Sequence, residues 1–250
     1  MNISKLAVAA SFVALAACNS ESSTTTPAAG GGAEVTAAPV PPPANGDWST
    51  VVKATPEGGY VMGNPDAKVK LVEYGSMTCS HCADFEEKAG QALVDNYVKK
   101  GWVSWEFRNF VRDSLDMTAS LVARCGGEAS FFGLTRNIFS EQKTWFANLQ
   151  GADQAKVQAI EAMPPAQRFN AIADLAGFKP FAAMRGVPGA KLDKCLADQK
   201  AVDQLVQMNA DAIAQYNIPG TPTFLINGTL FEKPGSWEEL EPAIKDALGS

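Results

Sequence analysis

Two apolar runs rich in β-branched and aromatic residues frame a segment with helical periodicity in the first half of the chain. The runs Lys68–Tyr74 and Trp102–Phe110 are predicted strands. Between them, the residues that recur at helical spacing are Cys82, Phe85, Ala89, Leu93 and Tyr97. They share one face of the predicted helix, and that face should turn toward the core. A strand–helix–strand order favours a parallel pair of strands.

The pattern before and after this unit predicts short strands and then a long helical region. Val51–Val52 and Tyr60–Met62 flank a Pro-Glu-Gly-Gly turn and are predicted short strands. Helical periodicity dominates from about Ser114 to Tyr216, with breaks at Gly126-Gly127, Pro164-Pro165 and Gly186-Val187-Pro188-Gly189. Aromatic residues at helical spacing are expected in the core of this region: Phe131, Phe132, Phe139, Trp145 and Phe146.

The chain returns to a β pattern near its C-terminus. Thr223–Ile226 and Thr229–Phe231 are separated by Asn227-Gly228, a dipeptide typical of tight hairpins. A helix is predicted over Trp237–Leu248. The arrangement therefore predicts an α/β fold in which a helical excursion separates two β-containing parts.

The first residues have the pattern of an export signal. Residues 1–17 carry one basic side chain, an apolar stretch from Leu6 and small residues at the end, and are too short to span a bilayer stably. Leu15-Ala16-Ala17-Cys18 resembles a bacterial lipoprotein signal, which implies lipidation of Cys18. Residues 18–47 are rich in Ser, Thr, Gly, Ala and Pro, and we interpret them as a flexible low-complexity tether.

Charge and hydropathy narrow the choice of partners. The formal net charge is −6, and removal of residues 1–17 leaves 20 Lys and Arg against 27 Asp and Glu, a net charge of −7. Basic residues form no cluster, which argues against a nucleic-acid partner. No long apolar segment follows residue 17, so membrane attachment is expected through Cys18 or not at all.

The sequence Cys79-Ser80-His81-Cys82 lies between a predicted strand and a predicted helix, and this setting indicates a redox centre. Cys79 sits where the helix begins, and unpaired amide groups and the helix dipole there favour a thiolate. His81, the only histidine, adds a positive charge when protonated. A zinc half-site and a pair of inert buried cysteines remain the alternatives.

The remaining cysteines suggest a structural bond. If Cys18 is lipidated, four of the five cysteines remain, and Cys125 and Cys195 are left without a nearby partner. In an oxidising compartment we expect these two to form a disulfide, worth about 4 kcal/mol in the chain-entropy model. Two separate buried thiols are the alternative.

Taken together, these motifs resemble the DsbA-like family of thiol:disulfide oxidoreductases. The resemblance rests on Glu73, the Cys79–Cys82 motif, the helical region, and Gly220-Thr221-Pro222-Thr223-Phe224. It implies a thioredoxin-like fold with an inserted helical domain. The parts would be residues 48–112 and 191–250 for the thioredoxin-like domain and 113–190 for the insertion.

The resemblance also implies roles for individual residues. Cys79 would be the exposed nucleophile and Cys82 the resolving thiol. Glu73 would be a buried acid that assists proton movement at the second cysteine, although a solvated carboxylate at the strand end is the alternative. Pro222 would be preceded by a cis peptide bond and, with Thr221, would contact substrate.

The expected function is the introduction of disulfide bonds into exported proteins by exchange through Cys79 and Cys82, with no cofactor and no metal. Expected partners are unfolded or reduced exported proteins and a membrane redox partner that reoxidises the pair. The chain is expected to act as a monomer, lipid-anchored on the periplasmic face of a bacterial membrane. Because Thr221 precedes the matched proline, an isomerase is one alternative function. A reductase and a non-catalytic lipoprotein on the same scaffold are further alternatives.

Overall fold

A computed structural model describes residues 43, 44, 46–233 and 235–249. The predicted signal peptide, the proposed lipidation site Cys18 and the tether as far as residue 42 lie outside the described residues. Within the part of the chain that is described, no helix combines the length and apolar character needed to cross a membrane.

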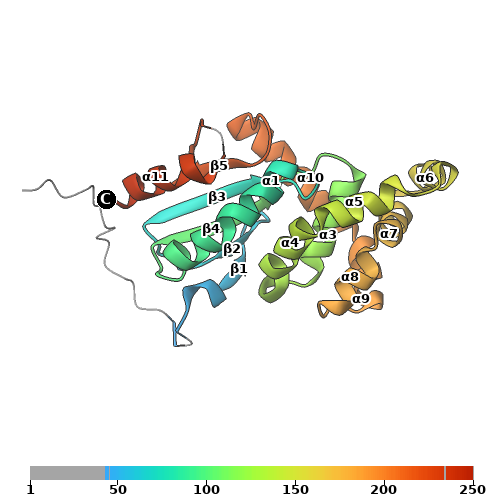
Figure 1. The fold of residues 1–250 in the computed structure, drawn as a ribbon, viewed down its shortest axis with the longest axis horizontal. Helices are drawn as coiled ribbons and strands as arrows, with labels where there is room; N and C mark the ends of the chain where they lie inside the picture. The colour runs from blue at the N-terminus through green and yellow to red at the C-terminus, as the bar shows by residue number, and fades with distance from the viewer. Residues whose placement is uncertain (1–42, 45, 234, 250) are drawn as a thin grey trace, which may run out of the picture. The chain divides into compact units, whose positions relative to one another are not determined.

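A six-stranded mixed sheet forms one layer of the molecule (Figure 1). Its spatial order is β1-β2-β4-β3-β5-β6. The strands are β1 (Val52–Ala54), β2 (Tyr60–Met62), β3 (Val69–Gly75), β4 (Val103–Asn109), β5 (Thr223–Ile226) and β6 (Thr229–Leu230). β3 and β4 pair in parallel, which confirms the strand–helix–strand prediction, and the other neighbours are antiparallel.

The central strand β3 carries Glu73, the acidic residue expected near the second cysteine. In β3, Glu73 lies opposite Phe107 of β4 on one side and Phe224 of β5 on the other. Six of the seven residues of β3 are buried, because helices cover both faces of this strand. The carboxyl group of Glu73 is therefore enclosed by the neighbouring strands and by the helices that cover the sheet.

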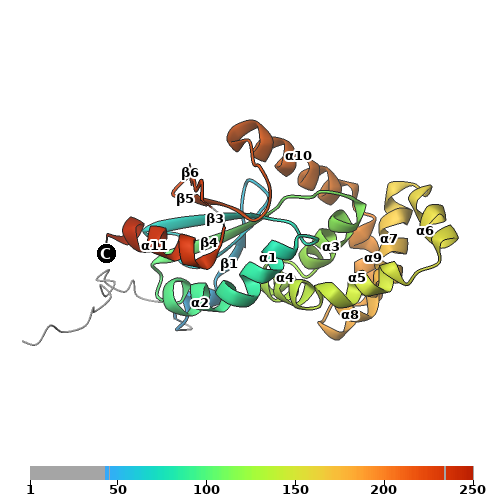
Figure 2. The same ribbon diagram turned by 45° about the horizontal axis from the view of Figure 1, so that its top comes forward.

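Helices cover the two faces of the sheet (Figure 2). One continuous helical segment follows β3 and consists of α1 (Ser80–Phe85), η2 (Glu86–Gly90), α2 (Gln91–Leu93) and η3 (Val94–Val98), where η2 and η3 are wider π-type turns. It shares its face with α11 (Trp237–Leu248), as the edge-on contact between Tyr97 and Trp237 shows. The long helix α10 (Gln199–Tyr216) covers the opposite face.

A layer of shorter helices lies beyond the carboxyl end of β3 (Figure 1). Its members are α3 (Ser114–Cys125), α4 (Phe131–Ser140), α5 (Gln142–Gln150), α6 (Gln154–Glu161), α7 (Pro165–Ala176), α8 (Phe178–Met184) and α9 (Gly189–Leu196). Single turns η1 (Trp48–Thr50) and η4 (Glu128–Ser130) complete the helical elements of the described residues. The expected end of the insertion at residue 190 falls inside α9, which packs on α3, α7 and α8.

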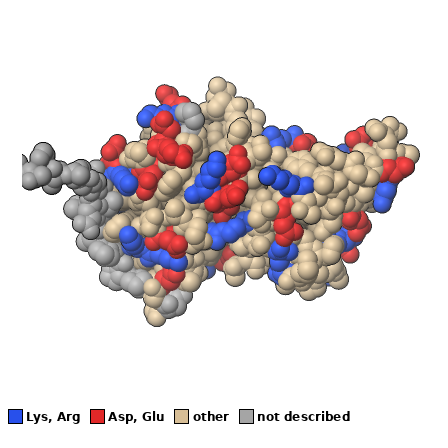
Figure 3. Space-filling view, in the orientation of Figure 1, with Lys and Arg blue, Asp and Glu red and all other residues tan. Residues whose placement is uncertain are grey.

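One hydrophobic core joins the sheet to this helical layer. The rings of Phe131 in α4 and Tyr60 in β2 stack with centroids 4.1 Å apart, and Phe131 also contacts Phe107 of β4. The prediction that the aromatic residues of the helical region are core is confirmed: Phe131, Phe132, Phe139 and Trp145 are buried, and Phe146 is partly buried against them. On the face drawn in Figure 3, acidic and basic side chains are interspersed over the described residues.

Candidate active site

The loop between β3 and α1 presents both cysteines. Cys79 has extended backbone angles (φ −85°, ψ 121°) and precedes the first residue of α1, so that amide groups of the first helical turn point toward its side chain. Cys82 lies one turn further on the buried face of α1. Both are free thiols in this structure. The predicted placement of the two cysteines at the start of a helix is confirmed.

Cys79 is more enclosed than the sequence suggested. We expected an exposed nucleophile, but the residue is 6% exposed, against 0% for Cys82. The reason is the loop before β5, which covers the sulfur: Cys79 Sγ donates to the carbonyl oxygen of Thr221 at 3.1 Å. The Cys79 sulfur therefore lies between α1 and this loop.

The environment of Cys79 favours its thiolate. Hydrogen bonding from the Cys82 thiol lowers the pKa of Cys79 most, and the Thr221 hydroxyl and the amides of Cys82 and His81 lower it further, against the opposing effect of burial. The result is a pKa of about 5, well below the usual value for a thiol. Such a pKa favours the thiolate of Cys79 at neutral pH, and in that form the sulfur no longer donates to the Thr221 carbonyl oxygen.

His81 acts differently from the expectation. Its side chain is 81% exposed, and its Nδ1 lies 4.0 Å from an Asp84 carboxylate oxygen rather than against the sulfur. Among the principal causes of the lowered Cys79 pKa, His81 contributes its backbone amide. The structure therefore assigns the stabilising role of residue 81 to its position in the first helical turn, not to its imidazole.

The pKa values of Cys82 and Glu73 are shifted in the opposite direction to that of Cys79. Burial raises the pKa of Cys82 well above its usual value, and the hydrogen bond to Cys79 and the charge of Glu73 raise it further. Glu73 is 1% exposed and accepts a hydrogen bond from Trp105 Nε1 at 3.1 Å. Burial, followed by the charge of Glu86, raises the pKa of Glu73 well above the usual carboxyl range. The alternative of a solvated carboxylate is thereby removed.

The loop that carries Pro222 borders a groove beside Cys79. The Thr221–Pro222 peptide bond is cis. The groove has a volume of about 350 Å³ and runs between α1 and the start of α11. It is lined by His81, Asp84, Phe85, Lys88, Thr221, Pro222, Gly235, Ser236, Trp237 and Glu238. Thr221 and Pro222, expected to contact substrate, thus lie at the wall of the groove nearest the reactive sulfur.

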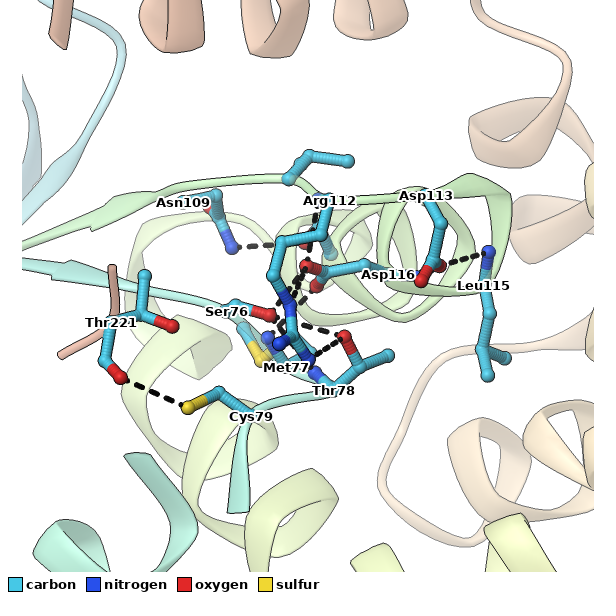
Figure 4. A network of polar contacts seen from close by, with 12 residues as sticks. Ser76, Met77, Thr78, Cys79, Asn109, Arg112, Asp113, Leu115, Asp116 and Thr221 are labelled. Atoms are coloured by element: carbon cyan, nitrogen blue, oxygen red, sulfur yellow. Dashed lines mark hydrogen bonds and ion pairs between the residues drawn. The ribbon is translucent and has the colours of Figure 1, made fainter. Parts of the chain in front are cut away.

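Three residues near the site were absent from the sequence-based prediction: Arg112, Asp116 and Gln142. All three contact the segment Ser76–Cys79 from the helical layer or the loop before it. Figure 4 shows Arg112 and Asp116 beside this segment. In the sequence, Asp116 looks like an ordinary acid in the first turn of a helix, and no local signal marks it as buried. Only the long-range packing of α3 on the β3–α1 loop identifies it.

The remaining pair of cysteines forms a bridge within the helical layer. Cys125 at the end of α3 and Cys195 in α9 are joined by a disulfide, 70 residues apart in sequence. This leaves Cys79 and Cys82 as the free thiols of the described residues. In the same part of the chain, no group of three or more His, Cys, Asp or Glu side chains is arranged to hold a metal ion.

Comparisons with known proteins agree with this geometry. A family described as thioredoxin matches residues 55–246. Among solved structures, the chain is similar to a protein-disulfide isomerase from Novosphingobium aromaticivorans, with a TM-score of 0.72 and 37% sequence identity over 76% of this chain and 97% of that one. It is also similar to alpha-DsbA1 of Wolbachia pipientis, with a TM-score of 0.62 and 20% identity over 76% of this chain and 91% of that one, a likeness of fold alone.

Several curated relatives come from the genus Rickettsia. A protein of Rickettsia bellii named "Putative protein-disulfide oxidoreductase" is 28% identical over 192 residues, which cover 77% of this chain and 65% of the relative. A relative with a similar name from Rickettsia typhi is 27% identical and is covered over 61% of its length. The chain therefore spans less than two thirds of these curated relatives.

Proposed function

This chain belongs to the thioredoxin family, among its DsbA-like members, and we propose that it catalyses thiol–disulfide exchange on proteins through Cys79 and Cys82. The observation that carries the proposal is the opposite displacement of the two thiol pKa values. The pKa of Cys79 is lowered to about 5, whereas that of Cys82 is raised well above its usual value. Such a pair has one sulfur suited to leaving as a thiolate and one suited to holding a proton.

The exchange proceeds in two successive thiol–disulfide exchange steps. A substrate thiolate attacks Cys79 of the oxidised Cys79–Cys82 pair, so that a bond forms from substrate sulfur to Cys79 and the bond to Cys82 breaks. The electron pair leaves on Cys82, whose raised pKa favours uptake of a proton, and the buried Glu73 carboxyl, whose pKa is also raised, would supply it. A second substrate thiolate then attacks the first substrate sulfur and releases Cys79 as a stable thiolate.

These steps oxidise the substrate dithiol to a disulfide and reduce the Cys79–Cys82 pair to a Cys79 thiolate and a Cys82 thiol. The low pKa of Cys79 favours this direction, because it stabilises the reduced form. We therefore propose an oxidant of reduced proteins that a membrane redox partner returns to the disulfide form. A reduction potential near that of glutathione in an oxidising compartment would support an oxidant, and a strongly negative potential would support a reductase.

An isomerase is the second candidate, favoured by one specific observation. The relative from Novosphingobium aromaticivorans, which shares 37% sequence identity, is titled a protein-disulfide isomerase. Incubation of the reduced chain with a substrate that contains scrambled disulfides separates the two functions. Recovery of the native pairing without net oxidation would favour the isomerase.

Trapping of mixed disulfides tests the proposed roles of the two cysteines. Cys82→Ala removes the thiol that resolves the intermediate, so substrate proteins should remain covalently attached to Cys79 on non-reducing gels. Cys79→Ala is the matched control and should trap nothing, because Cys82 is fully buried. Trapping by Cys79→Ala instead would reverse the assignment of the two roles.

We also propose that the chain is exported and anchored by lipid at Cys18, on the periplasmic face of a bacterial membrane. The support is the sequence Leu15-Ala16-Ala17-Cys18 after an apolar segment. In cells grown with a labelled fatty acid, the wild-type chain should carry label and sediment with membranes. Cys18→Ser should lose both properties, and label retained in this variant would overturn the anchor.

A further inference from the structure

The segment Ser76–Cys79, which joins β3 to α1, is held in place from the helical layer rather than from the sheet. Gln142 of α5 donates to the carbonyl oxygens of Met77 (2.9 Å) and Cys79 (3.1 Å). Arg112, in the loop before α3, donates to Thr78 Oγ1 at 2.6 Å. Figure 4 shows the Arg112 contact beside those of Asp116, on the residues that precede Cys79.

Asp116 makes the central contacts of this network. Its side chain is fully buried in the first turn of α3. Oδ2 accepts a hydrogen bond from Ser76 Oγ at 2.5 Å, and Oδ1 accepts one from the Met77 amide at 2.8 Å. The two carboxylate oxygens thus hold two consecutive residues of the loop, Ser76 and Met77, which lie three and two positions before Cys79.

The surroundings of Asp116 are arranged for an acceptor. Oδ2 also accepts from the Arg112 amide at 3.1 Å, and Arg112 Nε lies 3.9 Å from the same oxygen. Asp113, the N-cap residue of α3, adds a negative charge nearby. Ser76 in turn accepts from the Thr78 amide at 3.3 Å. A proton on Oδ2 would face the Arg112 amide, another donor, so the ionised and protonated forms of Asp116 cannot hold the loop identically.

We propose that Asp116 is a positioning residue for thiol–disulfide exchange, whose ionised carboxylate fixes Ser76 and Met77 and thereby places the Cys79 sulfur against Thr221 and the first turn of α1. The inference rests on the proposed function of Cys79. It gives the reaction a dependence on a second titrating group besides the thiol itself. In support, burial raises the pKa of Asp116 to about 6, against the lowering effect of its hydrogen bonds.

The loop geometry explains how a carboxylate that does not touch the thiol affects it. The Cys79 amide donates to the Ser76 carbonyl oxygen at 3.1 Å, so Ser76 and Cys79 close a tight turn. A shift of Ser76 would move Cys79 relative to the Thr221 carbonyl and to the helix amides. Small displacements of a reacting atom are enough to lower a rate constant strongly.

The test is the reactivity of the thiolate rather than its amount. The rate constant for alkylation of the reduced chain by iodoacetamide is measured from pH 4 to pH 8 and divided by the thiolate fraction, which is obtained from absorbance at 240 nm. In the wild type, this quotient should have its plateau at high pH and fall as the pH is lowered, with a midpoint near pH 6, the pKa of Asp116. In Asp116→Asn it should be independent of pH and about three- to tenfold below the wild-type plateau.

Two further variants keep the test decisive. Ser76→Ala keeps the charge of Asp116 but removes a hydrogen bond that lowers its pKa, so the midpoint should move to higher pH. This variant serves if Asp116→Asn fails to fold. Asp153→Asn is the matched control, since Asp153 caps α6 through amides of its own helix and should leave the quotient unchanged.

The same variants distinguish the titration of Asp116 from that of the other acids near the thiols. Glu73 and Glu86 also have raised pKa values, but their titration would persist in Asp116→Asn. An inflection that survives in Asp116→Asn, or a midpoint that does not move in Ser76→Ala, overturns the inference. If wild-type Cys79 lacked a low pKa and did not exchange with glutathione, the proposed function itself would fail, which is a different result.

Discussion

At the residue scale, the reactivity of Cys79 is set by groups that contact its sulfur directly. The Cys82 thiol and the Thr221 hydroxyl are side-chain partners, and the amides of His81 and Cys82 belong to the first turn of α1. The imidazole of His81 faces solvent and Asp84 instead. Surface charges of this kind are screened by water and salt, so they shift a neighbouring pKa much less than a direct hydrogen bond does.

The first prediction compares two neighbours of Cys79. Thr221→Val removes the hydroxyl that stabilises the thiolate and should raise the pKa of Cys79 by about 1 unit. His81→Ala keeps the backbone amide and should change that pKa by less than about half a unit. Thiolate absorbance at 240 nm against pH measures both. A larger shift in His81→Ala than in Thr221→Val would restore the role of the imidazole.

The second prediction concerns the buried carboxyl of Glu73. Because its pKa is raised in the folded state, the folded chain holds this proton more tightly than the unfolded chain does. The resulting stability is fully present below the ordinary carboxyl pKa and is lost as pH rises through the raised one. Relative to Glu73→Gln, the wild type should lose about 1.4 kcal/mol of unfolding free energy per pH unit within that window.

Urea unfolding at several pH values measures this difference. Glu87→Gln is a suitable control, because Glu87 is exposed in the same region and should show no such trend. Parallel stability curves for the wild type and Glu73→Gln would mean that Glu73 titrates as it does in water.

At the element scale, α3 contacts the loop before Cys79 at one end and is bonded to α9 at the other. Its first turn carries Asp116, which holds the loop before Cys79, and its last residue, Cys125, is bonded to Cys195 of α9. Asp113 caps the helix by accepting from the amides of Leu115 and Asp116, both at 2.9 Å. The disulfide thus ties one end of α3 to α9, while the other end serves the active-site loop.

The third prediction separates these two roles of α3. Replacing both Cys125 and Cys195 by Ala removes a bridge between residues separated by 70 positions and should cost about 4 kcal/mol of unfolding free energy in the chain-entropy model. The pKa of Cys79 should be unchanged, because the bridge is at the far end of α3 from Asp116. Urea unfolding under non-reducing conditions and thiolate titration give the two readouts, and a shifted pKa would show that the bridge tunes the site.

At the scale of the whole molecule, the redox state of Cys79 and Cys82 is linked to global stability. The sheet and the helical layer share one core, and the active-site loop lies between them. Any free energy stored in the Cys79 thiolate is therefore lost when the folded unit unfolds, because the helix terminus and the Thr221 loop no longer surround the sulfur.

The fourth prediction follows from that linkage. The pKa of Cys79 is lowered to about 5 in the folded state, so its contribution to stability is fully present above the unfolded thiol pKa and is lost as pH falls through 5. At pH 7 the thiolate should contribute about 2–3 kcal/mol to the reduced form, and below pH 5 almost nothing. The oxidised form lacks this titration. Urea midpoints of both forms at pH 4 and pH 7 measure it, and an equal gap at both values contradicts the linkage.

The expected α/β, thioredoxin-like fold with a helical insertion is confirmed, and particular elements show why it was predictable. Apolar runs predict β3 and β4, and Asn227-Gly228 predicts the turn between β5 and β6. The helix predicted over Trp237–Leu248 has those bounds in the structure. The expected end of the insertion, residue 190, lies inside α9, and helical periodicity alone does not show which neighbour a helix packs against.

The sequence by itself determined the Cys79–Cys82 pair, its place at a helix start, and the order of strands and helices, because these follow from local spacing and turn chemistry. Tertiary structure alone decided three features of the site. It covered Cys79 with the Thr221 loop, turned the His81 imidazole to solvent, and brought Asp116 to the loop before Cys79. Each depends on segments about 40 or more residues apart, or on which side of a helix meets solvent, and such contacts are fixed by packing rather than by neighbouring residues.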